Sequence, residues 1–295
     1  MASVQDLKRR IRSIRNTRKI TRAMELVAAA KLRRAEQRIR ALRPYAETMN
    51  ELIAGVGRAS SSVRLPLLEQ REQVEAVALV PLTGDRGLAG AFNAQIMRRA
   101  FALERALQGE GKTVRWVAVG KKSRSTLTFR RRELSGAYLG FTDRPTYADA
   151  QAVSHRVAEL FTEHEVDRVV LVYNTYVSAL TQRVTEQDIL PISPDILETD
   201  EEERRADVMR GDFIFEPEPE EILERLLPVY LETQIYRALL ESTASEQGAR
   251  MTAMRNASKN AGELIDSLTL RMNRARQAEI TQEILEVVAG AEALV

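Results

Sequence analysis

With 295 residues, the chain is long enough for one or two domains with a sizeable core, and its net charge of +2 is nearly balanced. Apolar residues make up 44% and charged residues 29%, which is typical of a soluble, helix-rich protein, while 5% aromatics argue against large nucleic-acid stacking surfaces. The absence of cysteine excludes disulfides and thiolate metal sites, and no apolar run approaches the ~20 residues that span a bilayer.

The small net charge hides two opposite blocks. Residues 1–44 carry fourteen Lys and Arg against three Asp and Glu, and residues 195–224 carry thirteen Asp and Glu against three Arg. Charge runs are usually solvated faces, but blocks this dense suggest two different partners or electrostatic docking.

Residues 1–58 are predicted to form one long helix. A single heptad register runs from residue 4 to residue 56, which is the pattern of a coiled-coil strand on the order of 80 Å long. Pro44 falls on the outer face of this register. The seam positions are Val4, Leu7, Ile11, Ile14, Arg18, Thr21, Glu25, Ala28, Leu32, Ala35, Ile39, Leu42, Ala46, Met49, Ile53 and Val56.

The seam is chemically interrupted in one place, where Arg18, Thr21 and Glu25 take its core positions. At this gap the apolar Ile20, Met24 and Val27 are displaced to other faces of the helix. We therefore expect something other than the partner helix to contact them.

Residues 70–195 alternate strand and helix signals, which predicts a central α/β domain with a mostly parallel, Rossmann-like sheet. The expected strands are β-branched runs, the expected helices lie between them, and the last segment is an added strand. In chain order these are Val74–Leu82, Ala91–Leu107, Val114–Val119, Ala148–Glu163, Arg168–Tyr173 and Val177–Ile189.

Residues 196–227 are predicted to form an acidic linker and the start of a helix, and residues 228–295 a second coiled-coil helix. Because the two helices are the ends of the chain, antiparallel pairing is the simplest closure. The apolar tip Ile284–Val295 extends past any partner that the first helix supplies, so it needs a partner from elsewhere. The expected seam is Met251, Met254, Ser258, Ala261, Ile265, Leu268, Met272 and Ala275.

Two other functions compete at this point. Thr83–Gly90 follows a strand and precedes a helix, as a phosphate-binding loop does, but its glycine spacing is not the dinucleotide pattern and it lacks the P-loop lysine. The plainer interpretation is a tight turn. A basic coiled-coil scaffold that binds nucleic acid or a membrane is the other alternative, although the arginines occupy all faces of the first helix.

Four motifs resemble those of the gamma subunit of F-type ATP synthases. Asn16–Ala35 is similar to that family's N-terminal signature, and Gly84–Asn93 to its midchain motif, with Gly84 in place of a small hydroxyl residue. Glu241–Gln247 with Arg250–Met251, and Ala275–Ile284, resemble the C-terminal motifs. The four lie in order along the whole chain, so the resemblance is specific.

The resemblance implies a non-catalytic rotor shaft that couples proton flow to ATP synthesis or hydrolysis at beta subunits. It implies a single copy inside a ring of alpha and beta subunits, with the α/β domain beside epsilon and on the membrane rotor ring. It also implies a peripheral position on the cytoplasmic face of the cell membrane, with no cofactor and no nucleic acid.

The resemblance further implies which residues contact other subunits. Met24, with the basic positions Arg33 and Arg34, corresponds to the region that faces acidic beta levers. Arg250, Gln277 and Thr281 correspond to positions that contact the catch region of beta and alpha. Phe213, Phe215 and Glu216 correspond to positions of the foot near the rotor ring.

Overall fold

The computed structural model describes residues 3–59, 65–179, 181–197 and 218–292. The chain forms two compact units, which are described separately. The coil unit comprises Met1–Ala29 and Arg250–Val295, and the sheet unit comprises Ala30–Ala249. The helices predicted over residues 1–58 and 228–295 therefore each contribute to both units.

The sheet unit is built on a five-stranded sheet in the order β3-β2-β1-β4-β5. Four strands are parallel, and β5 runs antiparallel to β4. This confirms the predicted mixed fold with a mostly parallel sheet. The strands are β1 (Ala76–Pro81), β2 (Thr113–Val119), β3 (Leu134–Tyr138), β4 (Arg168–Tyr176) and β5 (Gln182–Leu190).

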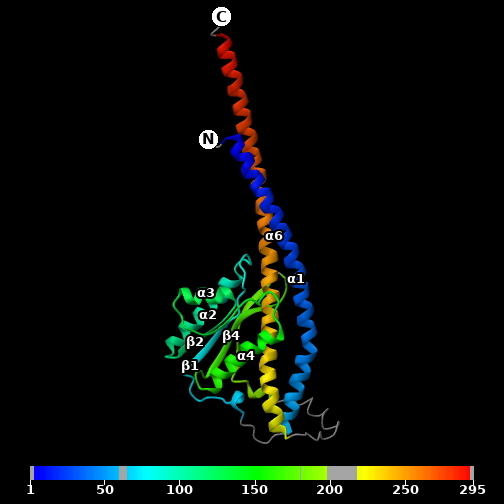
Figure 1. Ribbon diagram of the computed structural model, residues 1–295, viewed down its shortest axis with the longest axis vertical. Coiled ribbons are helices and arrows are strands. Elements are labelled where there is room, and N and C mark those ends of the chain that lie inside the picture. Colours follow the sequence, from blue (N-terminus) through cyan, green and yellow to red (C-terminus); the bar gives the residue numbers. More distant parts are fainter. Residues whose placement is uncertain (1–2, 60–64, 180, 198–217, 293–295) are drawn as a thin grey trace. The chain divides into compact units, whose positions relative to one another are not determined.

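Helices cover both faces of this sheet (Figure 1). On one face, α2 (Phe92–Gly109) and α3 (Lys121–Phe129) pack on alternate strand residues such as Val77 and Leu79. On the other face, the residues between them, such as Ala78 and Val80, contact α4 (Tyr147–Thr162) and parts of the two long helices. Burial on both faces explains why these strands read as continuous apolar runs.

Two elements of the sheet unit differ from the sequence prediction, because neither β3 nor α3 was expected. The strand Leu134–Tyr138 contains Gly136 and has no buried residue, so it carries little strand signal. The helix α3 has nine residues and buries only Ser123 and Leu127, so its periodicity is too short to recognise. Pairing with β2 and packing on the sheet stabilise these two elements.

The long helices are α1 (Val4–Ala59) and α6 (Pro219–Glu292), and α1 continues through Pro44. The C-terminal helix thus begins nine residues before the expected Pro228. Pro219 is compatible with a first turn, and Glu220 and Glu221 complement the positive end of the helix dipole. Short 3₁₀ turns lie at Pro66–Leu68 and Pro194–Leu197.

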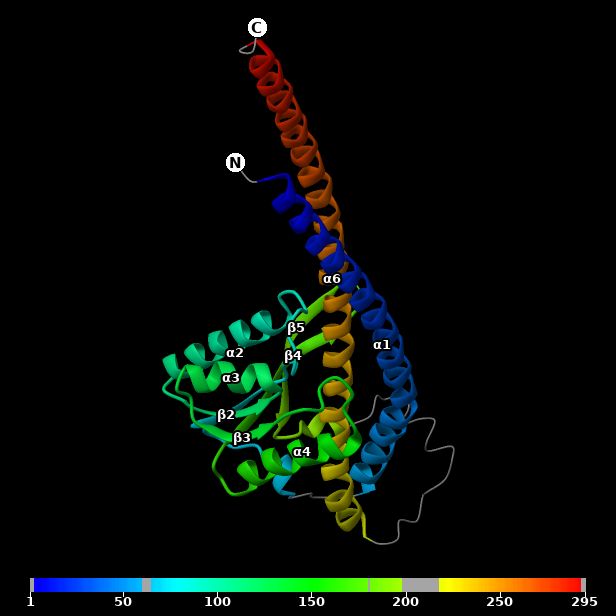
Figure 2. The same ribbon diagram turned by 45° about the horizontal axis from the view of Figure 1, so that its top comes forward.

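Within the sheet unit, segments of α1 and α6 lie beside the sheet face that α4 covers (Figure 2). Their buried residues recur at helical spacing and belong to one apolar cluster with the sheet. These residues are Met49, Ile53 and Val56 on α1, and Leu223, Leu227, Leu231 and Ile235 on α6.

In the coil unit, α1 and α6 pair antiparallel. Leu7 and Ile11 form a buried cluster with Ile265 and Leu268, and partner numbers fall on α6 as they rise on α1. The predicted antiparallel coil of the two terminal helices is thereby confirmed. Among the described residues, no helix is both long enough and apolar enough to pass through a membrane.

A glycine at the end of β2 generates the first testable prediction. Gly120 has φ +91° and ψ 150°, a region that is almost confined to glycine, and a Cβ there would lie 2.0 Å from the carbonyl oxygen of Thr83. We expect Gly120→Ala to lower the free energy of unfolding by about 3 kcal/mol or more, measured by urea denaturation.

Two matched controls separate the crowding from the strain. Gly111 has φ +80° with nothing within 4 Å of its added Cβ, and Gly109 is equally open without a positive φ. Gly111→Ala is expected to cost about 1–2 kcal/mol, and Gly109→Ala less than that. Equal stabilities of all three variants would contradict this account of Gly120.

Candidate interaction surfaces

A polar stretch of α6 lies buried at the carboxyl ends of the strands. The side chains of Ser242, Thr243 and Ser245 are almost fully enclosed. Each donates a hydrogen bond to a backbone carbonyl at this edge: Ser242 to Leu82 at 3.3 Å, Thr243 to Thr142 at 2.9 Å, and Ser245 to Asn174 at 3.0 Å. These hydroxyls therefore supply the hydrogen-bond donors that the carbonyl oxygens at this edge need.

The loop after β1 makes room for the same stretch. A Cβ on residue 84 would lie 2.5 Å from Oε1 of Glu246, so Gly84 permits the close approach of this buried carboxylate. The Gly84 amide donates to Oδ1 of Asn93 at 2.8 Å, which closes the turn into α2. The plainer interpretation of Thr83–Gly90, a tight turn, agrees with this geometry.

The carboxylate of Asp85 lies where a phosphate-binding loop would hold a phosphate. Its carboxylate accepts hydrogen bonds from the amides of Lys121 at 2.9 Å, Gly140 at 3.0 Å and Thr142 at 3.2 Å, and from the Thr142 hydroxyl. Burial raises the pKa of Asp85, but these hydrogen bonds outweigh it and hold the pKa below its usual range. The amide at the start of α3 is thus already paired with an anion of the chain itself.

Together these contacts occupy the crevice where doubly wound sheets bind ligands. That crevice lies outside the carboxyl ends of the strands at the point where strand order reverses, which here is between β1 and β4. Ser242 and Ser245 of α6 bond the segments that end β1 and β4. The interpretation as a nucleotide-dependent enzyme therefore has no support from this edge of the sheet.

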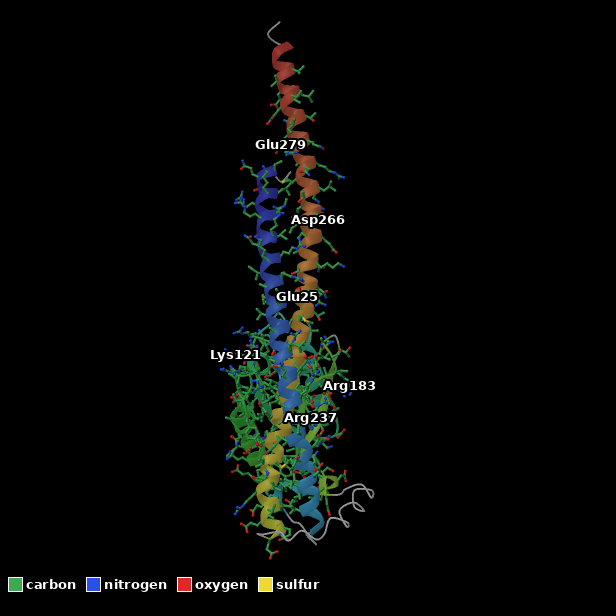
Figure 3. The ribbon with its side chains drawn as sticks, turned by 90° about the vertical axis from the view of Figure 1, so that its right-hand side faces the viewer. Glu25, Lys121, Arg183, Arg237, Asp266 and Glu279 are labelled. Atoms are coloured by element: carbon green, nitrogen blue, oxygen red, sulfur yellow. The ribbon has the colours of Figure 1, made fainter. Side chains whose placement is uncertain are left out.

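In the coil unit, paired side chains fill the polar gap of the seam. Glu25 marks its place in Figure 3. Thr21 and Ser258 share a hydrogen bond of 2.7 Å. The carboxylate of Glu25, which is 5% exposed, bonds Arg255 at 3.0 Å and Arg22 at 2.8 Å. Hydrogen bonding from Arg255 holds the pKa of Glu25 below its usual range, against the opposing effect of burial.

The structure shows how the interrupted seam is closed. Glu25 is held from both helices, and the Arg18 guanidinium lies beside Gly262, 3.6 Å from where a Cβ would stand. No local sequence signal identifies Arg255 as the partner of Glu25, because 230 residues separate them.

Outside the seam, α1 of the coil unit exposes apolar side chains. Ile20 is 60% exposed, Val27 56% and Leu26 62%, while Met24 is half-buried. This confirms that the displaced residues at the gap, Ile20 and Val27, do not face α6. We call Ile20, Met24, Leu26 and Val27 the apolar strip.

A basic groove of about 1080 Å³ adjoins this strip in the coil unit. Its floor includes Ile11, Ile265 and Met272, and six cationic residues line it. These are Lys8, Arg12, Arg15, Arg18, Lys19 and Arg22. The groove therefore combines apolar area with strong positive charge, which suits an acidic, amphipathic partner.

Residues 276–289 of α6 are all exposed (Figure 3). The seam with α1 ends at Met272 and Ala275, and the apolar residues beyond it are about half exposed or more. These residues are Ile280, Ile284, Leu285, Val287 and Val288, and the last four belong to the apolar tip. An isolated helix with this much uncovered apolar surface requires a partner outside the described chain.

The predicted contact residues are distributed over both units. Met24 is half-buried and Arg33 and Arg34 are exposed, whereas Arg250 is buried. Gln277 and Thr281 are exposed one turn apart, and the Thr281 hydroxyl donates to the Gln277 carbonyl at 2.9 Å. Phe213, Phe215 and Glu216 lie outside the described residues. No cluster of His, Asp and Glu among the described residues is arranged to hold a metal.

Comparison with known proteins matches the chain to one family along its whole length. The sequence pattern of the family described as ATP synthase covers residues 3–294. The ATP synthase gamma chain of Rubrobacter xylanophilus is 48% identical over 294 residues, which are 100% of this chain and 99% of that protein. The gamma chain of Desulforamulus reducens is 45% identical over 294 residues, covering 100% of both.

A solved structure supports the fold. A chain in the Euglena gracilis mitochondrial ATP synthase, in the OSCP/F1/c-ring assembly in rotational state 3, aligns with a TM-score of 0.69. The alignment covers 99% of this chain and 94% of that chain at 22% sequence identity. At this identity the likeness concerns the arrangement of helices and strands.

The hydrogen bonds of Asp85 generate a prediction with a defined pH dependence. Its folded pKa lies below the unfolded value of about 3.9, so its contribution is present above about pH 4 and is lost as the pH falls through the folded pKa. We expect Asp85→Asn to lower the free energy of unfolding by about 1–3 kcal/mol near pH 7.

The difference between the two proteins should shrink when urea unfolding is repeated near pH 3. Asp266→Asn, at an exposed position of α6, is the matched control and should change stability little at either pH. A penalty for Asp85→Asn that is independent of pH would show that the charge of Asp85 is not what stabilises the loop.

The Glu25 pair in the coil seam generates a second measurement. Because Arg255 is the main cause of the low Glu25 pKa, Arg255→Gln should raise that pKa toward its usual value in a carboxyl-detected NMR titration. Lys259→Gln, which disrupts an exposed contact of 3.9 Å with Glu263, should leave it unchanged. A Glu25 pKa insensitive to Arg255→Gln would refute the pairing.

Proposed function

Because this chain belongs to the ATP synthase gamma chain family, we propose that it works as a rotor shaft whose exposed residues contact the other subunits. The chain is a non-catalytic subunit of the central rotor, which couples ion transport to ATP synthesis and hydrolysis. Its partners are the alpha and beta subunits, epsilon and the membrane rotor ring.

The observation that supports a shaft most strongly is the coil unit, which exposes the apolar strip and the apolar tip. A rotating shaft has to contact partners that change as it turns, so its outer face must offer surface beyond the two-helix seam. Uncharged apolar side chains meet this requirement because their contacts are non-directional and tolerate sliding.

In our proposal, Met24 and the basic residues Arg33 and Arg34 face the levers of the beta subunits. The basic groove, which Leu26 of the apolar strip helps to line, supports an acidic partner for the coil unit. The proposal for Met24 rests on its place at the edge of the strip, half-buried and next to the paired Glu25.

The other predicted contacts remain proposals that rest on the motifs. Gln277 and Thr281, exposed below the apolar tip, are proposed to contact the catch region together with Arg250. Because Arg250 is buried, we expect it to act mainly by holding its surroundings in place. Phe213, Phe215 and Glu216 are proposed to lie near the rotor ring.

The chain is a peripheral component of a membrane complex, and we propose that it lies on the cytoplasmic face of the cell membrane in a single copy per complex. A basic scaffold for nucleic acid is the weaker alternative. The cationic groove has an apolar floor rather than aromatic stacking residues, which favours a protein partner over nucleic acid.

Substitution of Met24 tests the lever contact. A lysine there would add a strongly hydrated charge able to pair with an acidic lever in some rotary positions. An extra stabilisation of ~1.4 kcal/mol in those positions would slow the steps that leave them about tenfold. We therefore expect Met24→Lys to assemble but to pump fewer protons per ATP hydrolysed, measured in reconstituted vesicles.

Met24→Leu is the matched control, because it preserves an apolar side chain of similar size, and it should be nearly silent. Wild-type complex that hydrolyses ATP without pumping would argue against the coupling role itself. Equal pumping per ATP in wild type and Met24→Lys would instead argue only against the placement of Met24.

A further inference from the structure

The connection between β3 and α4, residues 139–146, forms hydrogen bonds or ion pairs with the loop after β1, with α1 and with α6. We infer that this loop, which we call the collar, transmits torque between the α/β domain and both long helices. The inference rests on the proposed rotor function and assigns a mechanical role to a loop that contains none of the proposed contacts with other subunits.

On one side, the collar is anchored to the sheet. Asp85, at the end of β1, accepts hydrogen bonds from the amides of Gly140 and Thr142 and from the Thr142 hydroxyl at 3.0–3.2 Å. At its other end, Thr146 and Asp149 form a reciprocal capping box that starts α4. The collar is thus tied to two parts of the α/β fold besides the strand it follows.

On the other side, the collar binds both long helices within the sheet unit. Asp143 pairs through Oδ2 with Lys31 of α1 and accepts through Oδ1 a bond of 2.8 Å from Gln247 of α6. Its neighbours repeat the arrangement. The Thr142 carbonyl accepts a bond of 2.9 Å from Thr243 of α6, and the Pro145 carbonyl accepts one from Arg38 of α1.

Directional bonds of this kind add to the resistance that close apolar packing already gives. Leu223, Leu227 and Leu231 hold α6 through a buried cluster, whereas the bonds of the collar fix individual pairs of atoms. Hydrogen bonds and ion pairs weaken steeply when their geometry is disturbed. Bonds from one loop to two helices therefore oppose slippage of either helix against the domain.

Asp143 is the positioning residue of the collar, because one carboxylate joins both helices. Its side chain is 34% exposed and that of Lys31 33%, so the pair is not a buried core element. Removing the carboxylate should loosen the link, and it also takes an acceptor from the buried amide of Gln247, which lowers stability. Asp143→Asn, which keeps an acceptor oxygen, is therefore measured beside Asp143→Ala.

The test uses the assembled complex in vesicles and compares ATP hydrolysis with the largest proton gradient that hydrolysis sustains. For Asp143→Ala we expect hydrolysis without a gradient to stay near that of wild type. The maximal proton concentration ratio should fall about twofold to fivefold, the factor that corresponds to an ion pair whose side chains are about one-third exposed. A structural defect alone would lower both readouts together.

Asp188→Ala is the matched control, because Asp188 pairs with Arg168 on the sheet at 2.6 Å and joins no helix to the collar. The exchange Lys31→Asp with Asp143→Lys should restore part of the lost gradient. If Asp143→Ala does not assemble, Asp143→Asn carries the same test, since it keeps an acceptor oxygen but loses the charge.

The outcomes are separable. Equal maximal gradients for wild type, Asp188→Ala and Asp143→Ala would overturn the collar. A loss in Asp143→Ala that the exchange does not rescue at all would also count against it. A wild-type complex that hydrolyses ATP without building any gradient would reject the proposed function and not the collar specifically.

Discussion

The fold depends on one constraint, the burial of a polar helical segment against the ends of a parallel sheet. Residues 241–247 of α6 are buried, and all but Ala244 are polar or charged. Such a segment is stable only where its hydroxyl and amide groups find partners. The strand-end segments offer carbonyl oxygens at Leu82 and Asn174, and the collar offers one at Thr142. These bonds set where α6 lies on the sheet within the sheet unit.

This buried polar segment lies where other doubly wound sheets bind their ligands. Doubly wound sheets bind ligands at the crevice where strand order reverses, but here a helix of the same chain fills that edge. Asp85 supplies the anion that the start of α3 attracts, so the amide of Lys121 already has a hydrogen-bond acceptor. Fold and function are separable, and this domain serves as an attachment point for helices and not as a catalytic site.

The coil unit shows the complementary strategy. Its seam contains a buried cluster of Leu7, Ile11, Ile265 and Leu268, and its polar gap is closed by Thr21 with Ser258 and by Glu25 with arginines of both helices. A buried charge that must meet its partner disfavours other registers of the two helices, since any slip would leave it unpaired. The apolar strip and the tip lie outside this seam and stay exposed.

The sequence by itself determined the seam and the central strands. Leu7, Ile11, Ile265 and Leu268 follow the heptad pattern, and β1, β2 and β4 are apolar runs, because period and composition are local properties. The displaced Ile20 and Val27 were also readable from the register. Only the tertiary structure decided that Leu134–Tyr138 is a strand, that Arg255 holds Glu25, and that Asp143 joins Lys31 to Gln247. Those pairings connect residues more than 100 positions apart, and no local period encodes which distant donor reaches a given acceptor.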